Sequence, residues 1–221
     1  MPARYLFAAL VLAIALAPSL ASAQADCDAP EPVCAARGAV FALSSPFDPL
    51  ASAVLVAPGE LVTNRHVVAD ETRVALRLAD GRRIEGEVVP GAYRGDLVLV
   101  RVPGLSGTPL ARAEAGDGPL YAIGADAPGG AIRVYAPGRL LAAPAAGKPR
   151  ARLHHTAESR PGNSGGALVD GDGRLAGIVT SGGEGRNEAV PVAGIAVLKA
   201  QSGPRHGADS ARIGAAYRAC Y

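Results

Sequence analysis

The chain has 221 residues and a formal net charge of +2, from 22 Lys and Arg against 20 Asp and Glu. This near-neutral balance excludes the strongly basic surface of a nucleic-acid-binding protein, so no nucleic-acid partner is expected. The three cysteines fit no zinc or haem spacing, and we expect no metal and no cofactor.

Residues 1–23 are predicted to be a cleavable signal peptide. Arg4 precedes an apolar run from Leu6 to Ala17, Pro18 interrupts the run, and Ala21-Ser22-Ala23 is a small-x-small cleavage pattern. The run is shorter than the roughly 20 residues that span a bilayer. We therefore expect a periplasmic or secreted protein with no membrane contact once the signal is removed.

Residues 24–37 form a lead-in rich in Pro and Ala, which contains Cys27 and Cys34. An oxidising compartment favours one disulfide among these two and Cys220. A bridge from either one to Cys220 would join the two ends of the domain, and a Cys27–Cys34 bridge would close a small loop. The sequence leaves all three pairings open.

From there the chain is a series of short apolar segments separated by Gly, Pro and Asp, which favours an all-β sandwich or a pair of barrels. We assign residues 38–200 to one domain and 201–221 to a C-terminal tail. Strands are predicted at Ala39–Leu43, Ala53–Val56, Leu61–Thr63, Arg73–Leu78, Arg83–Val89, Leu97–Val102, Leu120–Ile123, Ala131–Ala136, Arg152–Thr156, Ala167–Val169, Leu175–Thr180 and Gly194–Val197.

Only two segments have a helical pattern. Val67–Asp70 is predicted to form a short helical turn, and a final helix is predicted to run through Ala219 with Asp209 or Ser210 as its cap.

Ser164 is the candidate nucleophile, because it lies in Gly162-Asn163-Ser164-Gly165-Gly166. Flanking glycines free the backbone to aim the amides of Gly162 and Ser164 at a developing oxyanion. A serine hydroxyl also needs a neighbouring base to become nucleophilic.

His66 is the candidate base, because it follows the predicted strand Leu61–Thr63, and a strand end can hold an imidazole in position. The other histidines fit this role less well. His154 and His155 are adjacent on a strand and point to opposite faces, and His206 lies in a tail rich in Gly and Pro.

Asp96 is the candidate group that orients the imidazole. It begins an apolar strand, where an unpaired carboxylate would be costly to bury and a histidine partner offsets that cost. Asp70 is its main rival, but four residues after His66 it fits better as a solvated or capping residue.

These motifs resemble the chymotrypsin-fold serine proteases, specifically the protease domain of the HtrA/Deg type. The resemblance covers roughly residues 50–200, through Ala53–Val68, Val74–Val102, Tyr121–Gly124, Thr156–Asp170 and Gly177–Thr180. It implies two perpendicular six-stranded β-barrels with the site between them and a short C-terminal helix. It also implies that strand 177–182 pairs with an extended substrate, so Thr180, Ser181 and Gly182 are the predicted substrate-binding residues.

The chain departs from the family in three ways. Few residues follow Lys199, so we expect no PDZ domain, and a monomer is favoured over a caged assembly. Arg160 stands where the family often has Asn, near the presumed specificity pocket. Asn163 replaces the Asp with which trypsin-like zymogens bind a new N-terminal amine, so no activating cleavage beyond signal removal is expected.

The sequence thus predicts an exported serine endopeptidase that acts on polypeptides through an acyl-enzyme. Its pocket is expected to accept a modest apolar side chain, or alternatively to select a charged one through Glu158 or Arg160. The main alternative is a protease-like binding module with an idle active site. An α/β-hydrolase esterase would also match G-x-S-x-G, but it needs the order Ser, Asp, His and alternating helices, which this chain does not have.

Overall fold

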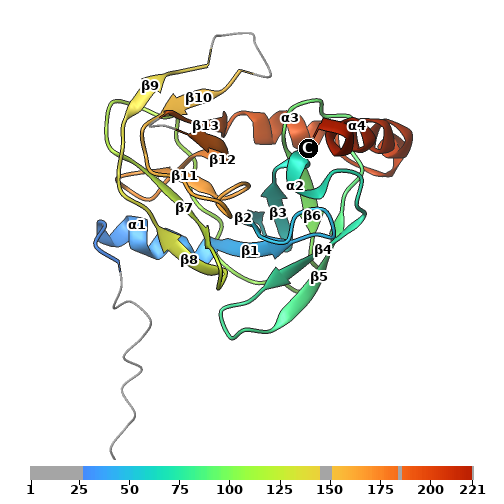
Figure 1. Cartoon of the computed structure of the whole chain (residues 1–221), viewed down its shortest axis with the longest axis horizontal. Helices are drawn as coiled ribbons and strands as arrows, with labels where there is room; N and C mark the ends of the chain where they lie inside the picture. The colour runs from blue at the N-terminus through green and yellow to red at the C-terminus, as the bar shows by residue number, and fades with distance from the viewer. Residues whose placement is uncertain (1–26, 145–150, 184–185, 221) are drawn as a thin grey trace, which may run out of the picture.

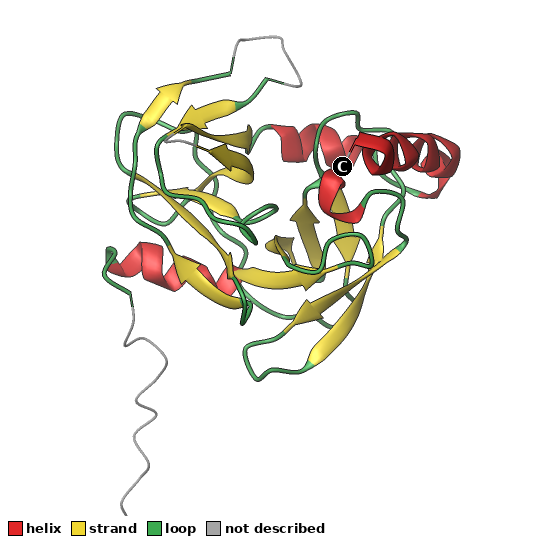
Figure 2. Cartoon of the chain, in the orientation of Figure 1, coloured by secondary structure: helices red, strands yellow, loops and turns green. Residues whose placement is uncertain are grey.

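The computed structural model describes residues 27–144, 151–183 and 186–220, and strands dominate it (Figure 2). The predicted signal peptide lies outside the described residues. Within the described ranges, no helix is long and apolar enough to cross a membrane.

The first half of the chain closes into a six-stranded barrel of antiparallel strands in the order β1-β2-β3-β6-β5-β4. Its strands are β1 (Val40–Ser44), β2 (Ala51–Ala57), β3 (Glu60–Thr63), β4 (Arg73–Arg77), β5 (Arg83–Val88) and β6 (Val98–Arg101). Strand β4 alternates buried residues with more exposed ones, whereas the first six residues of β2 are all buried. Strand β2 is enclosed because it also contacts β7 of the second half.

The second half is an antiparallel sheet in the order β8-β7-β11-β12-β13-β10-β9 (Figure 1). Its strands are β7 (Leu120–Asp126), β8 (Ala131–Val134), β9 (Leu140–Ala142), β10 (Leu153–His155), β11 (Ala167–Asp170), β12 (Leu175–Gly183) and β13 (Arg186–Pro191). The all-β, chymotrypsin-like class is confirmed. In detail, this half is a sheet of seven strands, where a barrel of six was expected.

The prediction of a strand at Gly194–Val197 was wrong, because these residues begin helix α3 (Gly194–Ala200). Ile195 and Leu198 are its buried side chains, at the i, i+3 spacing of a helix face. Strand β9, which has only three residues, and strand β13, which carries charged residues, were not predicted. Neither were the helices α1 (Glu31–Ala36), η1 (Arg37–Ala39) and η2 (Pro204–His206).

The predicted C-terminal helix is present as α4 (Gly207–Cys220), which begins before its expected caps. Asp209 and Ser210 lie inside its first turn, where Asp209 accepts a hydrogen bond from Arg212 at 2.9 Å. The disulfide joins Cys27 to Cys34, and Cys220 is a free, exposed thiol. Of the three pairings left open, the protein therefore uses the local one.

Helix α4 packs against α2 (Arg65–Val68), the helical turn that was predicted at Val67–Asp70 (Figure 1). Arg65 is fully enclosed between them, and its guanidinium donates to the Ser210 hydroxyl at 3.4 Å. Burial lowers the pKa of Arg65 to about 10. Gly214 lets the two backbones approach closely, because a Cβ there would lie 2.6 Å from the Ala69 carbonyl oxygen.

Gly214→Ala is therefore expected to destabilise the protein. Alanine favours a helix over glycine by about 1 kcal/mol, but overpacking against a backbone atom typically costs about 1–3 kcal/mol. The steric cost should prevail in denaturant unfolding. Gly207→Ala in the same helix is the matched control, because a Cβ at Gly207 meets nothing within 4 Å. Equal stabilities of the two variants would contradict the close packing of α4 on α2.

Candidate active site

His66 and Asp96 lie together at one end of the first barrel. His66 is in α2, directly after β3, and Asp96 directly precedes β6, which pairs with β3 through Thr63 and Val98. The Asp96 carboxylate lies 2.8 Å from His66 Nδ1 and accepts the His66 backbone N–H at 3.0 Å. Strand pairing thus brings together two residues that are 30 positions apart.

Asp96 is buried and held from several sides. Burial opposes its ionisation, but hydrogen bonds from His66, the charge interaction with His66 and a hydrogen bond from Thr180 together hold its pKa below the usual value. The Thr180 hydroxyl donates to Asp96 Oδ2 at 2.6 Å, and Asn64 Nδ2 donates to the Asp96 backbone carbonyl at 2.9 Å. These contacts stabilise a carboxylate.

Ser164 lies in the turn before β11, in the second half of the molecule. Gly162 and Gly165, on either side, have φ values of +97° and +83°, which favour glycine. Added Cβ atoms would lie 2.6 Å from the Ala125 carbonyl oxygen and 2.1 Å from the Ser52 carbonyl oxygen. The predicted glycine requirement around the serine is therefore met by backbone conformation and by space.

Thr180 of β12 joins the two halves of the site. Its carbonyl accepts the Ser164 hydroxyl at 3.1 Å, while its own hydroxyl is bonded to Asp96. Thr180 therefore contacts both Ser164 and Asp96, and Asp96 in turn contacts His66. Thr180 was predicted only as a substrate-binding residue. It lines the pocket beside Ser164, and its side chain also contacts Asp96.

The rival residues have other partners. Asp70 forms an ion pair with Arg218 of α4, His154 lies 3.4 Å from Glu188, and His206 accepts a hydrogen bond from Arg205. His155 is fully buried in β10.

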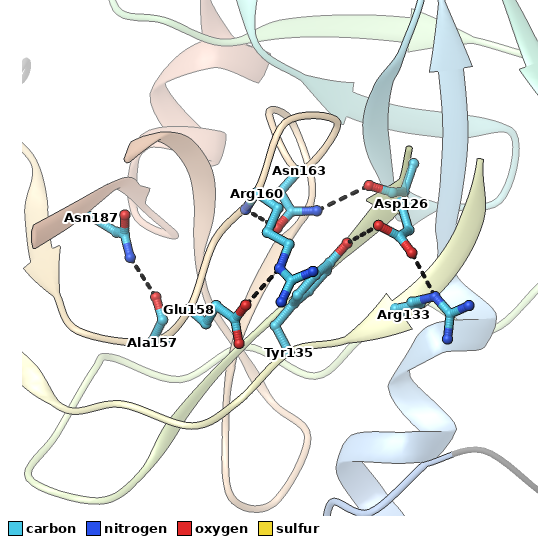
Figure 3. A network of polar contacts seen from close by, with 9 residues as sticks. Asp126, Arg133, Tyr135, Ala157, Glu158, Arg160, Asn163 and Asn187 are labelled. Carbon is cyan, nitrogen blue, oxygen red and sulfur yellow. Dashed lines mark hydrogen bonds and ion pairs between the residues drawn. The ribbon is translucent and has the colours of Figure 1, made fainter. Parts of the chain in front are cut away.

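The loop before Ser164 is fixed by polar contacts (Figure 3). Asn163 Nδ2 donates to the Ala125 carbonyl at 3.0 Å, and Asn163 Oδ1 accepts the Arg160 backbone N–H at 2.8 Å. In the described part of the chain, neither the Gly162 amide nor the Ser164 amide donates to another protein group. The assignment of these two amides as oxyanion donors stays a prediction.

A pocket of about 190 Å³ opens beside Ser164. One side is residues 159–161 with Asn163, and the other is Val179, Thr180 and Gly182 of β12. Ser181, also predicted to bind substrate, pairs with Glu188 of β13 in the strand register. The Arg160 guanidinium binds Glu158 at 2.6 Å and lies 5.8 Å from the centre of the Tyr135 ring (Figure 3).

Asn64 and Ser52 also belong to the site, and neither was predicted from the sequence. The Ser52 hydroxyl donates to the Gly162 carbonyl at 2.7 Å and accepts the Ala125 amide at 2.8 Å, so it joins the first barrel to the nucleophile loop. One signal was present in the sequence: Ser52 and Thr180 are polar residues within apolar strands, and buried polar groups need partners.

His155 gives the fold an acid-sensitive point. Its side chain is fully buried in β10, and burial lowers its pKa from 6.5 to about 4. The unfolded chain binds this proton more readily, so stability is lost as pH falls from 6.5 towards 4. At about pH 5 the loss is roughly 2 kcal/mol relative to neutral pH.

Replacing His155 by Leu should remove that part of the pH dependence of the unfolding free energy. His154→Gln is the control, because His154 is only partly buried. An unchanged acid slope in His155→Leu would show that His155 binds its proton as readily in the folded protein as in the unfolded chain.

Comparison with known proteins places this geometry in a class and then in a family. The Rv3671c protease of M. tuberculosis, in its inactive form, superposes with a TM-score of 0.65 at 24% identity, covering 79% of this chain and 97% of that one. The protein thus has the chymotrypsin-like fold. Residues 51–178 match the trypsin-like peptidase domain family, and the chain belongs to that family.

Its relatives support the HtrA/Deg type expected from the sequence. The periplasmic serine endoprotease DegP of Salmonella typhimurium is 31% identical over 147 residues, which cover 61% of this chain and 30% of that protein. A serine endoprotease structure from Yersinia pestis has a TM-score of 0.63 at 26% identity, covering 76% of this chain and 64% of that one. The chain spans about 30% of the length of the curated relatives it matches.

Proposed function

We propose that this protein is an exported serine endopeptidase that hydrolyses polypeptides through an acyl-enzyme. The observation that carries the proposal is that Asp96 binds His66, and that Asp96 and Ser164 both bind the same residue, Thr180, beside an open pocket. His66 is the base, Asp96 orients it, and Ser164 is the nucleophile.

In the first step, the Ser164 hydroxyl turns from the Thr180 carbonyl to His66, which takes its proton while Oγ bonds to the substrate carbonyl carbon. The negative charge moves to the carbonyl oxygen, where the amides of Gly162 and Ser164 stabilise it. Loss of one such donor typically costs about 2.7–4 kcal/mol of barrier. Asp96 stabilises the imidazolium that forms.

Collapse of this intermediate breaks the C–N bond, and His66 gives its proton to the leaving amine. Water then enters, and His66 takes a proton from it as the water oxygen bonds to the acyl carbon. The ester bond between that carbon and Ser164 Oγ then breaks. Ser164 recovers its proton as the acid product leaves. Substrate backbone is expected to align with β12, at Ser181 and Gly182, by strand addition.

Export is supported by the chemistry of the lead-in as well as by the relatives. Cys27 and Cys34 form a disulfide, and such bonds persist in oxidising compartments. Relatives such as DegP are named as periplasmic. We accordingly propose cleavage of residues 1–23, a protease domain at 38–200 and a C-terminal tail at 201–221, acting as a monomer.

Labelling with a fluorophosphonate probe tests the proposal. The folded protein should be labelled at Ser164, Ser164→Ala should not be labelled, and His66→Ala should be labelled far more slowly because its serine lacks a base. Absence of labelling in the folded wild-type protein would favour the idle binding module instead.

A further inference from the structure

We propose that the pocket beside Ser164 selects an uncharged carboxamide, glutamine or asparagine, as the side chain on the acyl side of the cleaved bond. The inference rests on the proposed function, because it concerns the substrate of that same site. It replaces the modest apolar side chain expected from the sequence.

The pocket is placed to receive that side chain. It is lined by Ser164 itself and by β12, the strand proposed to pair with the substrate backbone. A residue whose carbonyl carbon contacts Ser164 Oγ therefore directs its side chain between β12 and the loop at 159–161. The volume of about 190 Å³ accommodates a side chain of medium length.

Two polar groups surround one small volume at the Gly182 wall. Asn187 lies opposite Gly182 in the β12–β13 register, and its Oδ1 is 2.1 Å from the point where a Cβ on Gly182 would stand. The Ser159 Cβ is 3.5 Å from the same point. Any residue other than glycine at position 182 would place its Cβ in this volume.

Each of these two residues offers a hydrogen-bonding atom at this wall. Asn187 Nδ2 donates to the Ala157 carbonyl at 2.6 Å, which fixes the orientation of the amide and leaves Oδ1, an acceptor, toward Gly182 (Figure 3). The Ser159 hydroxyl is buried without a partner in the described chain. A buried hydroxyl without a hydrogen bond destabilises the protein, so a ligand that forms a hydrogen bond with it removes that cost and binds more tightly.

The polar groups at this wall disfavour a charged substrate side chain of either sign. Arg160 is the charged residue among those lining the pocket, and Glu158 already pairs with its guanidinium. A substrate carboxylate would meet the Asn187 oxygen, and an ammonium would have no carboxylate partner among the pocket residues. A carboxamide fits both groups, because its NH₂ donates to Asn187 Oδ1 and its oxygen accepts from the Ser159 hydroxyl.

The test uses peptides that differ only at the residue before the cleaved bond. Gln is compared with Met and Glu, which have similar length, and Asn with Leu and Asp. We expect kcat/KM for the carboxamide to exceed that of each counterpart by about 10-fold or more, because sites that hydrogen-bond a substrate discriminate strongly against analogues lacking the group. Equal or higher values for Met and Leu would overturn the inference.

Two variants at one position separate hydrogen bonding from shape. Ser159→Ala should bring the Gln/Met ratio of kcat/KM close to 1, and Ser159→Thr, which keeps a hydroxyl, should preserve most of it. If Ser159→Ala keeps the full ratio, Ser159 does not read the substrate and the inference is wrong.

Fluorophosphonate labelling of Ser164 is run on the same preparations. A labelled enzyme that prefers apolar or charged peptides refutes only the carboxamide preference. A folded protein that is neither labelled nor active on any peptide refutes the proposed function, and the preference with it.

Discussion

Ser164→Ala should lower turnover of a denatured protein substrate by about six orders of magnitude, to the level left by binding and the oxyanion donors. Without Oγ there is no acyl-enzyme, and no neighbouring hydroxyl replaces it, because Thr180 directs its own hydroxyl to Asp96. The fold should persist, since Oγ makes one hydrogen bond, to the Thr180 carbonyl, worth about 1 kcal/mol. Turnover and denaturant unfolding are measured on the same preparation.

Ser202→Ala is the matched control, because the Ser202 hydroxyl bonds to the Leu198 carbonyl near the end of α3. It should turn over substrate like the wild type. Comparable turnover in Ser164→Ala and the wild type would remove Ser164 as the nucleophile, and the endopeptidase proposal would fail with it.

Asp96→Asn should lower kcat by about four orders of magnitude. The carboxylate accepts from His66 Nδ1, so the lone pair that takes the serine proton lies on Nε2. An asparagine NH₂ turned toward Nδ1 would instead favour the tautomer that carries its proton on Nε2. Asparagine also offers one oxygen to the two donors, the His66 backbone N–H and the Thr180 hydroxyl, that the carboxylate now satisfies.

Asp70→Asn provides the comparison, because Asp70 follows the same helical turn but pairs with Arg218 of α4. Its kcat should stay near the wild-type value. An Asp96→Asn protein that retains about a tenth or more of wild-type kcat would show that Asp96 does not set the tautomer of His66.

The sequence alone was sufficient for the parts of the fold and site that depend on local chemistry. Gly-Asn-Ser-Gly-Gly indicates a turn with unusual backbone angles, and the positive φ values of Gly162 and Gly165 agree with that local requirement. Eleven of the predicted strands have counterparts in the structure, because alternating or fully apolar runs such as Ala51–Ala57 are typical of strands.

Contacts between distant segments could not be predicted in this way. Ser52 meets the Gly162 carbonyl across 110 positions, and Thr180 meets Asp96 across 84. Nothing near either residue in the chain indicates such a partner. The strand prediction at Gly194–Val197 was wrong for a different reason. A short apolar run fits a strand or a helix equally well, and the packing of Ile195 and Leu198 selects the helix.

The packing of α4 on α2 has a consequence for the order in which the enzyme is assembled. Every other contact of the site forms within residues before Gly207, but the backbone next to His66 is braced by Gly214 and Ser210, which are synthesised later. A nascent or truncated polypeptide ending before α4 would carry the nucleophile and the base without this brace. The support that α4 gives to the backbone next to His66 therefore forms only after α4 itself has been synthesised.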